Sequence, residues 1–205
     1  NAPLSQPLFR LLLWTGVLSL LIRTWIGATF PITGDEAYFY WWGVYPDWGY
    51  YDHPPMAGWA IAAMLKLFGD STFAMRIPAL LLPTALGAAL WWGFSDIDRE
   101  KTAWAILLFW LTPINWLNAL ITTDTPLIFW SVLSISALVR AEQRAQLDRA
   151  TYGLHALSGL FLGLAFLSKY FAVVIGLAYL VYFVAFRRER LLGFALLVAA
   201  ATPGP

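Results

Sequence analysis

The sequence contains no cysteine, few charged residues and almost no surplus of one charge. Only 12% of its 205 residues are Asp, Glu, Lys or Arg, about half the share in an ordinary soluble domain. Without cysteine there is neither a disulfide framework nor a thiolate metal site. A formal charge of +1 and the lack of a long Lys/Arg block exclude a basic surface for nucleic acid.

The sequence is instead rich in apolar residues. They make up 60% of the chain, and the mean hydropathy is +0.65. Because a helix needs about 20 mostly apolar residues to cross a bilayer, the sequence predicts an all-α, polytopic transmembrane bundle of six to seven spans. The candidate spans are residues 11–30, 74–94, 103–121, 125–140, 153–168 and 170–186, with an incomplete one from residue 191.

Residues 31–73 interrupt the spans and carry a shorter apolar segment, 56–68, between two prolines and Gly69. That segment is too short to span easily, so we interpret it as an interfacial or re-entrant helix. No repeat or flexible linker divides the chain. We therefore expect residues 1–205 to form one bundle, the N-terminal part of a longer protein.

The distribution of Lys and Arg predicts the orientation of the bundle, since basic loops stay in the cytoplasm. The nine that fall on one side are Arg10, Arg99, Lys101, Arg140, Arg144, Arg149, Arg187, Arg188 and Arg190. The four on the other side are Arg23, Lys66, Arg76 and Lys169. We predict a bacterial inner-membrane protein with a cytoplasmic N-terminus and residues 31–73 on the outer face.

The polar groups of the predicted outer loop lie in GDEAYFYWWGVYPDWGYYDHPP, residues 34–55. Asp35 and Glu36 are placed to begin a helix, where acids interact favourably with its dipole. Asp52 and His53 form a second pair that can bind a divalent metal or relay a proton. Two pairs of this kind are not a diagnostic ligand spacing, and an ordinary loop histidine is the alternative for His53.

Two further polar residues fall on the same predicted side of the membrane. Asp124 lies in a tight turn between spans, where Thr123 or Asp124 is a candidate helix cap with Pro126 in the first turn. Lys169 is flanked by apolar residues. It is either a lysine that extends to the membrane surface or a cation for a phosphate group.

The outer loop is also rich in aromatic rings, which have two interpretations. Trp and Tyr anchor loops at membrane interfaces without any catalytic role. Their faces also stack on sugars or line a groove for a prenyl chain. The residues that we consider for such a groove are Tyr38, Trp42, Tyr50 and Tyr51.

Five short motifs in order carry a family resemblance: DEAYFYWW, YYDHPPMAGW, FGDSTFAMRIP, TTDTPLIFW and LSKY. This order resembles the membrane glycosyltransferases of the GT-C type, in particular dolichyl-phosphate-mannose protein mannosyltransferases and the lipid A aminoarabinose transferase. The resemblance implies transfer of a sugar from a polyprenyl-phosphate donor to a lipid, glycan or protein acceptor on the outer face. It also implies inversion at the anomeric carbon.

The resemblance implies roles for the residues already singled out. Asp35 takes the place of the general base and Glu36 completes the acidic pair. Asp124 matches the second acidic position. Asp52 matches an acid that binds metal in relatives, although His53 departs from the aminoarabinose transferase, which has lysine there.

Stabilising the departing phosphate requires a cation or a metal. Lys169 is the first candidate and Arg76 the second, and a divalent metal of unknown identity is the possible cofactor.

Two alternatives belong to other functional classes. In the first alternative, the chain is a non-catalytic membrane subunit of a larger complex and packs against membrane-protein partners and lipids. In the second it is a transporter or lipid-binding protein whose outer charges bind a solute. The ordered motifs argue against the second alternative but do not separate the first from an enzyme.

Overall fold

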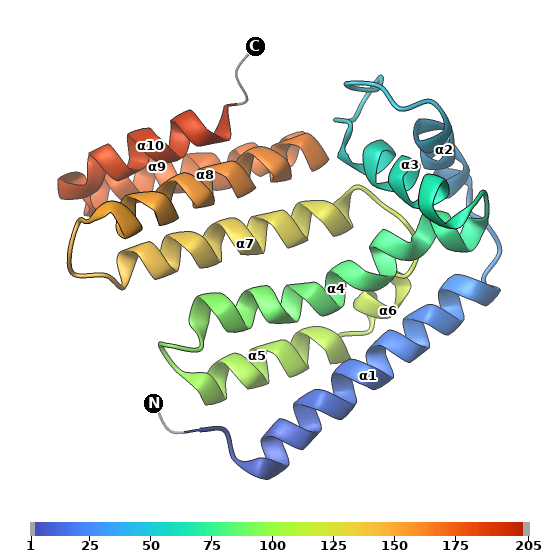
Figure 1. The fold of residues 1–205 in the computed structure, drawn as a ribbon, viewed down its shortest axis with the longest axis horizontal. Helices are drawn as coiled ribbons and strands as arrows, with labels where there is room; N and C mark the ends of the chain where they lie inside the picture. Colours follow the sequence, from blue (N-terminus) through green and yellow to red (C-terminus); the bar gives the residue numbers. More distant parts are fainter. Residues whose placement is uncertain (1–2, 203–205) are drawn as a thin grey trace.

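The computed structural model describes residues 3–202, apart from the side chain of residue 117, and this part of the chain is helical without a β-strand (Figure 1). The prediction of an all-α fold is confirmed. The longer helices are α1 (Gln6–Thr29), α2 (Gly34–Val44), α3 (Met56–Phe68), α4 (Thr72–Phe94), α5 (Arg99–Leu111), α7 (Asp124–Glu142), α8 (Arg149–Ser168), α9 (Val173–Phe186) and α10 (Leu191–Ala201). The short ones are α6 (Ile114–Leu117), η1 (Tyr170–Ala172) and η2 (Arg188–Arg190).

Polar side chains fix where five of the helices begin. Each of them accepts a hydrogen bond from the backbone amide three residues later, which satisfies an amide that has no partner within the helix. These N-caps are Ser5, Thr33, Ser71, Asp98 and Asp148.

Four helices, α1, α4, α7 and α8, are long and apolar enough to cross a membrane. The segments Tyr170–Phe186 and Arg188–Ala201 reach that standard only together, and a bend of 116° separates them. By length and composition, residues 3–202 therefore contain four candidate spans, or up to five, and the expectation of six to seven was too high.

The predicted span at 103–121 is not one continuous helix, because Pro113 interrupts it. The residue before a proline avoids helical dihedrals, and Thr112 is accordingly extended, with φ −63° and ψ 122°. Helix α5 ends at Leu111, and α6 adds four residues before the chain leaves helical structure. The hydropathy of the segment is high throughout, so composition alone did not reveal this break.

The helices lie side by side, with α2 and α3 at one end of the bundle (Figure 1). That end, which we call the acidic end, also holds the last turn of α1, the segment 118–123 and the link from α8 to η1. The opposite end, the basic end, holds the start of α1, the α4–α5 and α7–α8 connections and the bend at η2 (Figure 1). The nine Lys and Arg residues predicted to be cytoplasmic lie on elements of this basic end, while its orientation in a membrane stays a prediction.

Several charges at the basic end are paired around Glu142. Glu142 accepts a hydrogen bond from Tyr182 Oη at 3.0 Å and forms ion pairs with Arg187 at 2.8 Å and Arg190 at 3.3 Å. The buried imidazole of His155 lies 3.3 Å from the same carboxylate. This cluster joins α7, α8, α9 and the η2 bend.

A separate apolar core holds the acidic end together. Buried side chains of α2, α3 and α4 meet there, and Ile121 from the segment before α7 completes the cluster. Gly43 permits the close approach of α2 and α3, since a Cβ there would collide with Ile61, and Gly58 leaves room for the ring of Tyr50 on the connecting loop. The beginning of α2 is thereby fixed against the beginnings of α4 and α7.

Candidate functional site

The centre of the acidic end is a buried ion pair between Glu36 of α2 and Arg76 of α4. Arg76 Nε donates to Glu36 Oε1 at 2.8 Å, and Arg76 Nη2 donates to Oε2 at 2.7 Å. Both side chains are 1% exposed. The two hydrogen bonds form a bidentate pair between the planar guanidinium group and the carboxylate.

Arg76 uses its three remaining N–H groups on backbone carbonyls at the end of α1. Nη1 donates to Gly27 O at 3.0 Å and Phe30 O at 2.8 Å, and Nη2 donates to Pro31 O at 3.0 Å. All five N–H groups of the guanidinium therefore have protein acceptors. In this structure Arg76 offers no donor to a phosphate, so its placement argues against the predicted direct contact.

Glu36 is bonded as completely as its partner. Besides Arg76, its carboxylate accepts from the Thr33 amide at 3.2 Å, from Thr33 Oγ1 at 3.3 Å and from the Ile121 amide at 3.1 Å. Thr33 and Glu36 also form the capping box that begins α2. Glu36 thus joins α1, α2, α4 and the segment before α7, a placement that suits a structural role better than the predicted catalytic one.

The pKa of Glu36 reflects two opposing effects. Burial raises the pKa of the carboxyl, but the hydrogen bonds from Arg76, Thr33 and Ile121 and the charge of Arg76 favour the ionised form. The net result is a pKa below the ordinary value. Glu36 is therefore an ionised anchor at neutral pH.

Asp35, the residue next to this anchor, has the opposite surroundings. Its side chain is exposed, and within the described residues its carboxylate has no hydrogen bond and no ion pair. The first turn of α2 fixes its backbone, because Glu36 is held on the far side of the same turn. Asp35 is thus a free carboxylate on a rigid support.

Asp124 and Lys169, predicted at the tops of two helix pairs, are brought together. Lys169 Nζ donates to Asp124 Oδ1 at 2.7 Å, with 35% and 53% of the two side chains exposed. Asp124 begins α7, but Thr123 is at the N-cap position and no side chain caps the helix. Thr123 thus occupies the predicted N-cap position without a capping bond from its side chain, and the carboxylate of Asp124 binds the ammonium group of Lys169.

Asp52 and His53 lie on the loop between α2 and α3, with His53 Nδ1 2.9 Å from Asp52 Oδ1. The contact with His53 lowers the pKa of the Asp52 carboxyl, with a smaller contribution from Tyr38. In the described part of the chain no group of three or more His, Cys, Asp or Glu side chains is placed to hold a metal ion. Asp52 and His53 would provide two metal ligands, whereas such a site needs three or more. The metal therefore stays a prediction.

The four rings predicted for a groove separate into two kinds. Trp42 and Tyr50 stack face to face, with centroids 4.4 Å apart and planes 6° apart, and Tyr38 packs edge-on against Trp42 at 4.9 Å. Tyr50 Oη also donates to Trp42 O at 2.9 Å. Tyr51 is fully exposed. The stacked pair holds the loop, whereas Tyr51 presents its ring to the surroundings.

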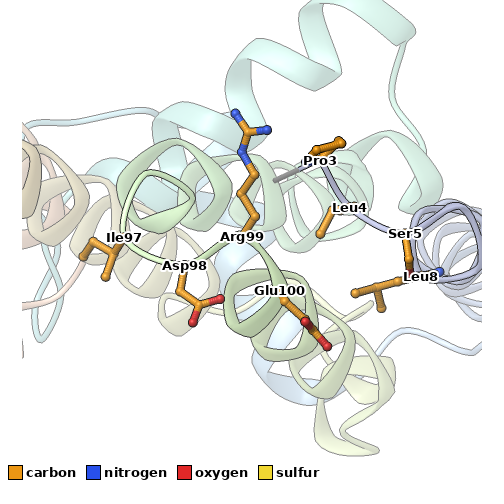
Figure 2. Close-up of a pocket in the computed structure, with 8 residues that line it drawn as sticks. All are labelled: Pro3, Leu4, Ser5, Leu8, Ile97, Asp98, Arg99 and Glu100. Carbon is orange, nitrogen blue, oxygen red and sulfur yellow. Dashed lines mark hydrogen bonds between the residues drawn. The ribbon is translucent and has the colours of Figure 1, made fainter. Parts of the chain in front are cut away.

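Cavities elsewhere do not involve these residues. One cavity, of about 500 Å³, lies at the basic end. Figure 2 shows the residues that line it, among them Ser5 and Leu8 at the start of α1 and Asp98, Arg99 and Glu100 at the start of α5. It lies at the opposite end of the bundle from Asp35 and Lys169. We assign it no role.

Sequence reasoning missed the two groups that fix Glu36, the Thr33 side chain and the Ile121 amide. The capping box was visible in the sequence, since Thr33 precedes Glu36 by three residues. Nothing in the sequence indicates the Ile121 contact, because it joins residues 85 positions apart.

Known proteins similar to this chain are sugar transferases by description. A family described as dolichyl-phosphate-mannose-protein mannosyltransferase matches residues 52–202. The lipid A galacturonosyltransferase RgtD of Rhizobium johnstonii is 30% identical over 139 residues, which make up 66% of this chain and 28% of that protein.

A solved structure is similar over almost the whole chain. The S. cerevisiae protein O-mannosyltransferase Pmt1-Pmt2 complex bound to the sugar donor aligns with a TM-score of 0.72 and 17% identity, covering 98% of this chain and 33% of that one. At this identity the likeness shows a shared fold. The chain thus spans a third or less of the length of these relatives. With the family match covering most of its length, the chain belongs to the dolichyl-phosphate-mannose-protein mannosyltransferase family and to the GT-C glycosyltransferases, as the order of its motifs predicted.

Proposed function

We propose that the protein transfers a glycosyl group from a polyprenyl-phosphate-linked sugar to a lipid, glycan or protein acceptor, with Asp35 as the general base. The observation that carries this proposal is the contrast between neighbouring residues. Asp35 is exposed and unbonded within the described chain, while Glu36 is buried and fully bonded. A base has to reach a proton on the acceptor, and only Asp35 of the two has that freedom.

The chemistry needs one base and one site for the departing phosphate. As the acceptor oxygen bonds to C1 of the donor sugar, its proton passes to the Asp35 carboxylate. The bond between C1 and the phosphate oxygen breaks, and its electron pair stays on the lipid phosphate. A single displacement of this kind inverts the anomeric carbon.

Lys169 is the cation that we propose for the departing phosphate. An ammonium group has three N–H donors, and the structure uses one of them on Asp124. Within the described residues the other two have no protein acceptor, so they are available to phosphate oxygens while Asp124 holds the side chain in place. A positive charge fixed in advance stabilises the negative charge that develops on the leaving group.

The first test compares Asp35→Asn with the unchanged full-length protein in membrane vesicles supplied with labelled polyprenyl-phosphate sugars. Removing a general base typically lowers a rate by about 10² to 10⁴, and we expect a fall in kcat of at least about 100-fold with no change in thermal stability. Glu100→Gln, which changes an exposed acid at the basic end, is the matched control.

Two outcomes would contradict the proposal. Full transfer by Asp35→Asn would show that Asp35 is not the base. No transfer by the unchanged protein with any donor would favour the non-catalytic subunit.

We also propose that the acidic end faces the outside of a bacterial inner membrane, because nine of the 13 Lys and Arg residues lie on elements of the other end. The lack of cysteine makes this easy to test. In intact spheroplasts a membrane-impermeant maleimide should label Asp70→Cys and leave Arg149→Cys unlabelled. The reverse pattern would invert the orientation and place Asp35 in the cytoplasm.

A further inference from the structure

Three aromatic side chains on the loop between α2 and α3 are exposed, and Trp48 and Tyr51 are more exposed than the rings on the helices. Tyr45 is 67% exposed, Trp48 is 85% exposed and Tyr51 is 100% exposed. Exposed rings are costly to leave in water, because each one presents a large apolar face. Their concentration on one short loop points to a partner for that loop.

The backbone beneath these rings is held rigidly. The Tyr50 amide donates to His53 O at 2.9 Å, and Trp59 Nε1 donates to Asp47 O at 2.9 Å. The Asp47 amide donates to Tyr50 Oη at 3.2 Å. Trp48 additionally meets Trp59 edge to face at 5.4 Å. The rings are therefore displayed on a fixed support, which lowers the entropy lost when a partner binds.

The charge around the rings is negative. No Lys or Arg occurs between Arg23 and Lys66. Asp47 and Asp52 lie on the loop itself, and both are exposed. The loop thus combines open aromatic faces with anionic hydrogen-bond acceptors.

We infer that this loop binds the carbohydrate of a sugar-bearing acceptor, with Trp48 and Tyr51 stacked on the sugar ring. The C–H face of a pyranose packs on an aromatic face, and its hydroxyl groups donate to carboxylates. The inference rests on the proposed function and adds the acceptor class to it. It also places the acceptor and the donor on different sides of the site. Asp47 and Asp52 would repel the donor phosphate from the loop, so we expect the phosphate to bind beside Lys169.

Anchoring in lipid headgroups is the competing use of the same rings. Interfacial Trp and Tyr belts occur on many membrane proteins, but anionic headgroups attract basic segments. A loop with two exposed carboxylates and no cation is repelled by such headgroups. The charge therefore favours a neutral or cationic sugar over an anionic lipid surface.

The test uses full-length protein in nanodiscs and saturation-transfer NMR, which requires no turnover. The probes are a soluble β-1,6-linked glucosamine disaccharide and a threonine-containing peptide. We expect saturation transfer to the disaccharide and none to the peptide. The signal should fall at least threefold in Trp48→Ala/Tyr51→Ala and persist in Trp48→Phe/Tyr51→Phe, which keeps the aromatic faces. Transfer to the peptide alone, or an undiminished signal in the alanine variant, would overturn the inference.

A second measurement decides between the sugar and the bilayer. The difference in fluorescence between the unchanged protein and Trp48→Phe reports on Trp48, and neutral acrylamide should quench it whereas brominated lipid should not. The matched control is Trp14→Phe on α1, a ring that is 66% exposed on a candidate span and should be quenched by the lipid. Quenching of Trp48 by brominated lipid would assign the loop to the membrane. Sugar binding without any sugar transfer would contradict the proposed function alone.

Discussion

The two ion pairs at the acidic end contrast in almost every physical respect. Glu36 and Arg76 are 1% exposed, and every donor of the guanidinium is satisfied. Asp124 and Lys169 are joined by one bond of 2.7 Å and keep 53% and 35% of their side chains exposed. One pair is closed to any ligand, and the other has donors and acceptors to spare.

This difference indicates different roles for two acid–base pairs that are not distinguished by the sequence. A closed pair can hold helices in place but cannot contact a substrate without breaking. An open pair adds little stability and remains able to bind. We therefore expect changes at the closed pair to alter folding first, and changes at the open pair to alter ligand binding first.

The largest effect should follow the loss of Arg76. Arg76→Met leaves the Glu36 carboxylate buried without its cation, and breaking a buried pair in this way costs about 3 to 5 kcal/mol. Thermal unfolding of the purified protein in detergent measures the loss, with the exposed Arg149→Met as control. If the free energy of unfolding fell by less than about 1 kcal/mol, as for a surface ion pair, the proposed difference between the two pairs would be wrong.

The closed pair should also give the protein a pH dependence of stability. The pKa of Glu36 is lower in the folded protein than its ordinary value of 4.5. Its contribution is therefore complete above about pH 4.5 and is lost as the pH falls through the lower folded value. Tm should decline more steeply below pH 4.5 in the unchanged protein than in Glu36→Gln. Parallel curves for the two proteins would show that the carboxylate is not held ionised.

The smallest effect on stability, with a clear effect on function, should come from Lys169→Met. The lost pair is partly exposed, so the free energy of unfolding should change by less than about 1 kcal/mol. The KM for the lipid-linked donor should rise about tenfold, a change that corresponds to about 1.4 kcal/mol of binding. Lys66→Met removes an exposed cation of α3 and is the control. An unchanged KM would leave the donor phosphate without its proposed partner.

Local features of this protein were predictable from the sequence. The hydrophobic runs gave the helical class, and Thr33 with Glu36 marks the start of α2. The shared side of Asp124 and Lys169 followed from counting spans. The partners of Glu36 were not predictable, because Arg76 and Ile121 approach it only after α2, α4 and the segment before α7 have packed. For the same reason the sequence did not separate Trp42 and Tyr50, which stack on each other, from the open ring of Tyr51.

The early end of α5 at Pro113 has a consequence for the spacing of the site. It leaves a stretch of chain from Thr112 to Thr123 that is mostly not helical and that delivers the Ile121 amide to Glu36. Ile121 and Asp124 are three residues apart, so the bond to Glu36 ties the start of α7 to the start of α2. We expect that inserting or deleting one residue between Ile121 and Asp124 would shift the proposed phosphate site relative to the proposed base while leaving both groups intact.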